Sequence, residues 1–408
     1  MKIHSNRTIL AAIATTAAAW LFTVTVAGQG APPARPAAPA APPRPAAPAG
    51  QAAAAAPAGE RPQMSDEVFK NVQVLKGIPV DQFMGTMGFF SAALGLNCTD
   101  CHTTESGGDW TKYADDNALK RQARRMVMMM NTINMTNFGG RPVVTCFTCH
   151  RGNSKPQVMP SLDLLYSSPP PEEPGEPIVQ APGQPTPDQV FDKYIQASGG
   201  AQRTAALTSL SAKGSYMGFD DADKVPLEIY ATNQAQRTTI VHSLSGDSTT
   251  VVTPAAGWLA APLTDRPLPL IPLTGTDLEG VKLEVLAFFP ARLKQALTAL
   301  RVGYPTELND KDVIVLQGNI AGNGTATLCF DAKTGLLTRM VHWGNSPVGR
   351  IVQRVDYSDY RDVAGVKLPF KYTVTWLDGR SQFELSDIQA NTRIDPSRFT
   401  KPAPSTPR

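Results

Sequence analysis

The chain has 408 residues, a formal net charge of +3 and 18% charged residues. This weak, balanced charge argues against nucleic acid as a partner, because such partners require a concentrated basic surface. The length allows more than one domain, and prolines are concentrated in two stretches that predict the boundaries between domains.

The N-terminal segment has the pattern of an export signal. Lys2 and Arg7 precede an uncharged, mostly apolar run that ends in small residues near Ala27. This pattern predicts a signal peptide over residues 1–28 and a periplasmic protein. The apolar run is also long enough to span a bilayer, so an uncleaved anchor that tethers the protein to the membrane is the alternative.

Two Pro-rich stretches have no periodic apolar face that a core could bury, and they therefore predict linkers. They comprise residues 29–63, which are rich in Ala and Pro, and residues 166–187, which include three consecutive prolines. The linkers delimit two predicted domains, residues 64–165 and residues 188–402.

Helical periodicity dominates residues 64–165. The expected helices run from Ser65 to Gly77, from Pro79 to Gly95, and from Asp115 or Asp116 to Gly139. Capping residues at their starts and glycines at their ends support these limits. The sequence therefore predicts an α-helical first domain.

Two copies of Cys-x-x-Cys-His follow the second and third expected helices. The copies comprise Cys98, Cys101 and His102, and Cys146, Cys149 and His150. In this pattern the thiols attach haem through thioether bonds and the imidazole ligates the iron. The sequence thus predicts two haem c groups and an electron-transfer protein rather than an enzyme. A haem enzyme, which would need an open coordination position, is a further alternative. A zinc ribbon also pairs cysteines, but the two pairs lie much further apart than that motif requires.

The helix before each motif can offer a thioether to the other side of the iron. The candidates are Met84 and Met87 before the first motif, and Met126, Met128, Met129, Met130 and Met135 before the second. Met on an apolar helical stripe is more often a core filler. Periodicity alone therefore does not choose among these residues.

Residues 71–152 resemble the tetrahaem cytochrome subunit of bacterial photosynthetic reaction centres. The resemblance lies in FMGTM (83–87), LGLNCTDCH (94–102), ARRM (123–126) and VTCFTCHRG (144–152). In that family the helix before each motif supplies the axial Met, which implies Met87 for the first haem and Met126 for the second. The family has two similar halves with four haems, and this chain resembles one half. The resemblance implies a dihaem module with periplasmic or membrane redox partners, without docking to a reaction centre.

Alternating periodicity takes over in residues 188–402. After one expected helix from Asp188 to Gly200, strands are expected near residues 313–316, 325–330, 366–376 and 383–385, which predicts an antiparallel sheet. The pattern resembles the curved sheet of outer-membrane lipoprotein-carrier proteins, which implies a lipid ligand. The predicted fold class is an α-helical dihaem cytochrome c domain followed by a β-rich domain with a curved antiparallel sheet and a helix. The alternative function is a lipid or ligand carrier or sensor in which the haems are sensory or structural.

The remaining chemistry-bearing residues of the second domain have structural interpretations. Cys329 lies in a strand-like segment and is expected to be a buried, inert thiol. His242 and His342 stand alone on β segments and are also expected to be structural.

Overall fold

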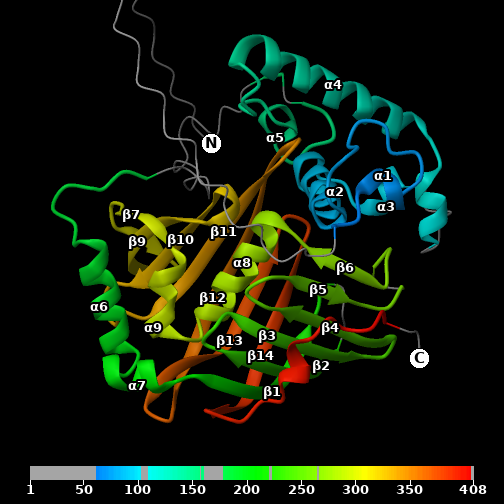
Figure 1. Ribbon diagram of the computed structural model, residues 1–408. Helices are drawn as coiled ribbons and strands as arrows, with labels where there is room; N and C mark the ends of the chain where they lie inside the picture. The colour runs from blue at the N-terminus through cyan, green and yellow to red at the C-terminus, as the bar shows by residue number, and fades with distance from the viewer. Residues whose placement is uncertain are drawn as a thin grey trace, which may run out of the picture. The chain divides into compact units, whose positions relative to one another are not determined.

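The computed structural model describes residues 61–102, 109–156, 158–159, 178–219, 223–263 and 266–405 (Figure 1). Residues 56–408 form one compact unit. The expected signal peptide of residues 1–28 and most of the linker at residues 29–63 lie outside the described residues. In the part of the chain that is described, no helix combines the length and the apolar character that a membrane span requires.

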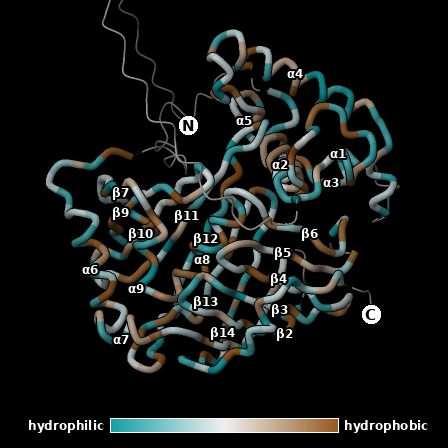
Figure 2. The backbone as a smooth tube through the Cα atoms, in the orientation of Figure 1, coloured by the Kyte–Doolittle hydropathy of each residue, from teal (hydrophilic) through white to brown (hydrophobic). Residues whose placement is uncertain are grey.

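Six short or medium helical elements make up the first part of the described chain. They are α1 Ser65–Val68, α2 Val80–Leu94, α3 Cys98–Cys101, the 3₁₀ helix η2 Trp110–Ala114, α4 Ala118–Phe138 and α5 Cys146–His150. Two of the expected glycine stops are confirmed, because Gly95 and Gly139 cap α2 and α4 in the left-handed conformation at φ 63° and φ 61°. Figure 2 shows that hydrophilic residues cover much of α4, whose buried side chains are Val127, Met130 and Asn134.

Two of the predicted helix limits are wrong. The expected helix from Ser65 to Gly77 is a single turn that ends at Val68. Ser65 does not cap it, because its hydroxyl donates to the Leu75 carbonyl (2.7 Å) and so folds the following segment back onto the turn. The third helix starts at Ala118 instead of beside Asp115, because Asn117 caps it by accepting the Lys120 N–H with its side chain.

The second part of the chain forms one antiparallel sheet of 14 strands in the order β6-β5-β4-β3-β2-β1-β14-β13-β12-β11-β10-β9-β7, with β8 paired to β9. The strands are β1 Ser209–Met217, β2 Val225–Thr232, β3 Gln236–Ser243, β4 Gly246–Val252, β5 Gly257–Ala260, β6 Leu270–Leu273, β7 Thr298–Val302, β8 Thr306–Leu308, β9 Lys311–Ile320, β10 Gly324–Asp331, β11 Leu337–Ser346, β12 Gly349–Val363, β13 Val366–Trp376 and β14 Gly379–Ala390. The strands expected near residues 313–316, 325–330, 366–376 and 383–385 are thereby confirmed. The first and last strands pair with each other, so the two ends of the domain meet inside the sheet.

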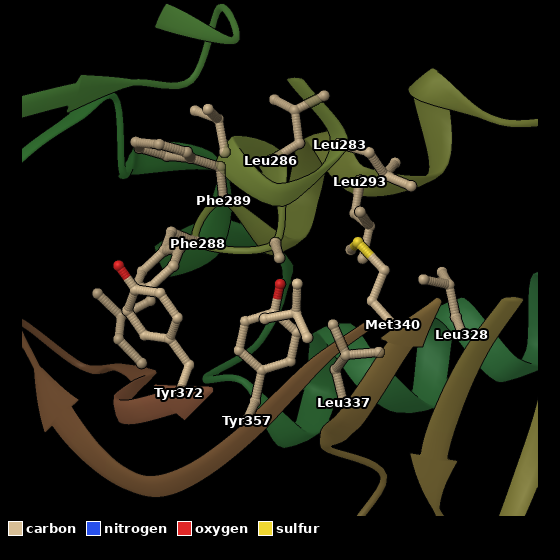
Figure 3. Close-up of a cluster of buried hydrophobic side chains, with 14 of the residues drawn as sticks. Leu283, Leu286, Phe288, Phe289, Leu293, Leu328, Leu337, Met340, Tyr357 and Tyr372 are labelled. Carbon is tan, nitrogen blue, oxygen red and sulfur yellow. The ribbon is translucent and has the colours of Figure 1, made fainter. Parts of the chain in front are cut away.

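Helical elements lie on the concave face of this sheet. They are α6 Pro187–Ala197, α7 Ala201–Ala206, α8 Gly275–Leu286 and α9 Pro290–Leu293, with the 3₁₀ turns η4 Lys294–Ala296 and η5 Ala321–Asn323 (Figure 1). The 3₁₀ turn η6 Pro396–Phe399 lies against the opposite face, where Arg398 stacks on the Tyr230 ring. Figure 1 shows the sheet bending around α8. In Figure 3, Phe288 points toward Tyr372, and Met340 reaches toward the segment that carries Leu283 and Leu293. The Phe288 and Tyr372 rings meet edge to face at 5.6 Å.

Helix α6 confirms the expected helix from Asp188, but the folded part of the sheet domain begins before it. The Ala181 N–H donates to the Val302 carbonyl (2.8 Å), and the Ile178 N–H donates to the Gln317 side chain (3.0 Å). Ala181 is buried. The domain thus includes residues from Ile178 onward, which lie inside the linker predicted at residues 166–187.

Sequence periodicity did not predict α8. Its last four residues, from Leu283 to Leu286, are all buried and include the charged Glu284. Four consecutive buried residues, one of them a carboxylate, do not form the one-sided apolar stripe by which an amphipathic helix is identified.

Candidate functional site

The two Cys-x-x-Cys-His motifs form the one-turn helices α3 and α5, and each starts with its own reciprocal cap. In α3, the Asn97 side-chain oxygen Oδ1 accepts the Asp100 N–H (3.0 Å) while the Asp100 carboxylate accepts the Asn97 N–H (2.8 Å). In α5, the hydroxyls of Thr145 and Thr148 exchange the equivalent bonds (3.3 and 3.0 Å). The short motifs therefore carry their own helix-start signals.

One helical turn brings the two thiols of each motif to the same side, because residues three apart are neighbours on a helix. None of these four described cysteines is in a disulfide; Cys98 and Cys149 are exposed, and Cys101 and Cys146 are half-buried. Burial raises the pKa of Cys146 to about 11 and also raises the pKa of Cys101. Within the described residues, no three His, Cys, Asp or Glu side chains gather as a metal ion would require.

Each motif's imidazole is oriented by a backbone carbonyl. Nδ1 of His102 lies 3.0 Å from the Tyr113 oxygen, and Nδ1 of His150 lies 3.0 Å from the Asn153 oxygen. Because a carbonyl only accepts, Nδ1 carries the proton and Nε2 keeps its lone pair. Burial, together with the Lys120 ammonium, lowers the pKa of His102. A neutral imidazole with a fixed tautomer is the form that binds a metal.

The end of α2 joins the two motifs. The Gly152 N–H, two residues after the second motif, donates to the Ala93 carbonyl near the end of α2 (2.9 Å). A Cβ on Gly95 would lie 2.3 Å from the Gly152 oxygen, and both glycines have positive φ. Only glycine fits this close approach of two chain segments. Gly95, at the end of α2 before the first motif, and Gly152, after the second motif, therefore allow the two motifs to lie close together.

Two asparagines fix the motifs to α4, and the sequence analysis missed both. The buried Asn134 side chain donates to the Val144 carbonyl (2.7 Å) and accepts the Val144 N–H (2.9 Å). The Asn117 amide donates to the Cys101 carbonyl (2.7 Å) while its oxygen caps α4. Asn117 could have been found, since Asn before an apolar-periodic run is a helix-start signal. No local signal marks Asn134, which sits on the buried side of the helix like an apolar residue.

The candidate Met residues have different surroundings. Met87 is half-buried and packs against the apolar cluster of α2 and α4, with Phe83 and Phe90 on the same helical face. Met126 is half-buried outside that cluster, whereas Met130 is buried. The exposed candidates are Met128, Met129 and Met135. The assignment of Met87 and Met126 as iron ligands stays a prediction.

The apolar cluster of the helical region includes a residue of the sheet. Its buried side chains come from α2, α4 and the segment before α2, and they also include Val348 of the β11–β12 turn. Leu377, from the β13–β14 turn, packs at its edge. Trp110 of η2 donates from its indole to the Leu263 carbonyl (2.7 Å). The region that carries both motifs is therefore in direct contact with the sheet domain.

In the sheet domain, the residues expected to be structural are either buried or paired with a carboxylate. Cys329 is buried, and burial raises the pKa of its thiol to about 12. The buried His342 imidazole bonds to the Glu284 carboxylate through Nε2 (3.0 Å). The His242 imidazole pairs with Asp247 (3.1 Å) near the surface.

The comparisons with known proteins match the two parts of the chain to different relatives. The family model described as photosynthetic reaction centre cytochrome C subunit matches residues 41–172. The corresponding subunit of Thermochromatium tepidum is 35% identical over 97 residues, which cover 23% of this chain and 23% of that protein. The Rubrivivax gelatinosus subunit is 36% identical over 97 residues, which cover 25% of its length. This chain thus spans about a quarter of the length of the curated relatives it matches.

Solved structures match the sheet domain with low sequence identity. A LolA superfamily protein from Nitrosomonas europaea has a TM-score of 0.38 and 12% identity over 53% of this chain and 99% of that one. A putative outer membrane lipoprotein-sorting protein domain from Vibrio parahaemolyticus has a TM-score of 0.34 and 11% identity over 52% of this chain and 97% of that one. The family evidence thus lies in the helical region, whose residues 41–172 match the photosynthetic reaction centre cytochrome c subunit family.

Proposed function

We propose that the chain is an exported dihaem c-type cytochrome that transfers single electrons. The proposed attachment thiols are Cys98 and Cys101 for one haem, and Cys146 and Cys149 for the other. The proposed axial ligands are His102 with Met87, and His150 with Met126. Bound haem supplies a one-electron Fe(III)/Fe(II) couple, and filling both axial positions restricts the chemistry to electron transfer rather than catalysis on a substrate.

The orientation of the two imidazoles carries this proposal. Each Nδ1–H donates to a carbonyl, of Tyr113 or Asn153, and each Nε2 is left available next to two thiols on the same helical turn. Hydrogen bonding at Nδ1 holds the ring in place and raises its basicity as a ligand. The same arrangement occurs at two independent motifs, which supports a count of two haems.

The alternative function of a lipid carrier gains no support from the concave face of the sheet. One small cavity of about 10 Å³ lies between the sheet and α8, among residues such as Leu210, Arg237 and Phe288. That volume holds about one water molecule. Electron transfer between periplasmic or membrane redox partners therefore remains the proposal.

Intact-mass analysis of the exported holoprotein tests the haem count. After acidic extraction of non-covalent haem, the expected mass exceeds that of the processed chain by two haems. Replacing Cys98 and Cys101 together by Ala is expected to leave one haem, and so is replacing Cys146 and Cys149. A wild-type protein with one covalent haem or none would reject the proposal.

Spectroscopy of Met variants tests the axial ligands. The ferric wild-type protein is expected to be low-spin with the near-infrared band of a thioether–iron bond. Met87→Ala and Met126→Ala are each expected to remove this signature from one haem, while the neighbouring variants Met84→Ala and Met128→Ala keep both. Loss of a signature in a control variant would transfer the ligand role to that residue.

A further inference from the structure

Helix α2 has two opposite faces, and only one of them belongs to the proposed haem site. Gly85 and Met87 are two residues apart, so their directions differ by about 160° around the helix. The face with Met87 also carries Phe83 and Phe90, at helical spacing. The face with Gly85 also carries Gly88 and Asp81. The residues that pack against the glycine face therefore determine the position of α2 and, with it, the position of Met87.

Strand β12 and the turn after β13 lie behind that face. A Cβ on Gly85 would come within 2.8 Å of Cδ1 of Ile351, and one on Gly88 within 2.7 Å of Oδ1 of Asp378. Phe89 packs its ring directly onto Gly349, where a Cβ would lie 2.2 Å from Cζ. The two surfaces are thus in van der Waals contact, with glycines in place of side chains.

The β11–β12 turn also extends into the core of the helical region. Val348 is fully buried, at 0% exposure, among Phe89 and Ala93 of α2 and Val127 and Met130 of α4. The turn is itself braced, because the Ser346 hydroxyl donates to the Gly349 carbonyl (2.9 Å) and accepts the Val348 N–H (3.3 Å). This hydrogen-bonded turn thus packs between helices α2 and α4.

A third contact fixes the start of α2. The buried Asp81 carboxylate accepts the Thr274 N–H (2.5 Å) and hydroxyl (2.9 Å) at the start of α8. The Gln82 amide donates to the same hydroxyl (3.2 Å). The helix is therefore held by the sheet domain at its first turn and along its glycine face.

We infer that the β11–β12 turn is part of the first haem site, in which Val348 and Gly349 are positioning residues that hold α2 so that Met87 stays on the iron. The inference rests on the proposed function, and it assigns the sheet domain a role in ligation. A ligating side chain keeps its geometry only when the packing behind it is fixed. Loosening this turn increases the fraction of time that Met87 is off the iron.

Competition with imidazole measures that fraction in the full-length holoprotein. External imidazole binds ferric iron only when the thioether is displaced, so its apparent affinity rises in proportion to the displaced population. Val348→Ala removes the packing of the turn, and Gly349→Ala drives the turn and Phe89 apart. In both variants we expect imidazole to bind the first haem at least about tenfold more tightly. We expect a smaller change at the second haem, because Val348 also packs against Val127 and Met130 of α4.

The matched control is Val355→Ala. Val355 lies on the same strand β12 with 1% exposure, but it packs in the core of the sheet. It loses the same atoms, so we expect a similar loss of thermal stability and an imidazole affinity within about twofold of the wild type. The Met87→Ala variant identifies the affected haem, because the thioether–iron band of the first haem is absent from its spectrum.

Each outcome decides the inference. Imidazole affinities of Val348→Ala that match the wild type at both haems would overturn it, whatever the stability of the variant. If Gly349→Ala does not accumulate, Val348→Ala alone decides. A wild-type protein without any thioether–iron band would instead reject the His/Met ligation of the proposed function, and the inference with it. These failures are distinguishable because the wild-type spectrum is recorded first.

Discussion

In the helical region, six buried apolar side chains among the described residues make up the core cluster, and one of them, Val348, comes from the sheet. In the sheet domain, the core cluster draws on elements from α6 to β14. The first region therefore depends on local caps, single hydrogen bonds and, in our proposal, covalent cofactors. The second depends on the burial of a large apolar surface, which stabilises a fold without any ligand.

The polar groups of the two regions differ in the same way. In the helical region, hydrogen bonds such as those of Asn134 fix short segments in place. In the sheet domain, the buried Glu284 carboxylate receives hydrogen bonds or charge from His342, Arg237 and Gln353. Burial raises the pKa of Glu284, but these partners outweigh it, so that the pKa lies below its usual value. Breaking either kind of contact tests how each region is held together.

The largest effect on stability is expected from Glu284→Ala. The substitution leaves Arg237, whose side chain is 13% exposed, buried without its carboxylate. Removing one partner of a buried pair costs about 3 to 5 kcal/mol of unfolding free energy, measurable by urea denaturation.

Glu384→Ala provides the surface control for this prediction. Glu384 pairs with Lys224 while half of the Lys224 side chain is exposed, and loss of a surface pair costs about 1 kcal/mol or less. Equal effects of the two substitutions would contradict a structural role for the buried cluster.

An intermediate effect is expected from Asn134→Ala in the helical region. The variant leaves both polar groups of the Val144 backbone without partners, which costs about 2 kcal/mol. Because Val144 directly precedes the second motif, we expect faster hydrogen exchange in residues 141–150 and less haem on Cys146 and Cys149.

Asn137→Ala is the control on the same helix. Its exposed side chain makes one hydrogen bond, to the Ile133 carbonyl, so the variant is expected to retain wild-type exchange near the second motif. If both variants exchange like the wild type, Asn134 does not hold the motif in place.

The smallest effect is pH-dependent and lies where the two regions meet. Burial, with the nearby Asp81 charge, raises the pKa of Asp277 to about 6. The folded state therefore holds this proton more tightly than the unfolded chain, so this group's contribution to stability is full below about pH 4 and decreases as the pH rises through 6. Asp277→Asn removes the dependence.

At pH 7 we expect Asp277→Asn to be more stable than the wild type by about 1 to 2 kcal/mol. A two-unit shift alone corresponds to about 3 kcal/mol, and the position of Asp277 in the first turn of α8 reduces this, because a helix start favours a negative charge. At pH 4 the two proteins are expected to have equal stability. Denaturation at both pH values measures the difference, and a variant that is less stable at pH 7 would contradict the burial argument.

Much of the helical region could be predicted from the sequence because its determinants are local. The Cys-x-x-Cys-His spacing, the glycine stops of α2 and α4 and the Met-bearing helices all lie within a few turns of one another. The predicted helix after Ser65 failed because the Ser65 hydroxyl bonds to the Leu75 carbonyl, a contact that has no helical spacing. In the sheet, the alternating pattern correctly predicted all or part of β9, β10, β13 and β14, but it did not identify β11 or β12.

What the sequence determined by itself is the identity of the proposed haem-attaching residues, the antiparallel sheet and the buried thiol of Cys329, because spacing and alternation are properties of the chain. Tertiary structure alone decided the place of α8, the role of Asn134 and the contact of Val348 with α2. These features arise where segments far apart in the chain meet, as when Asp81 binds Thr274. Their energy depends on the partner that packing supplies, and no local pattern specifies that partner.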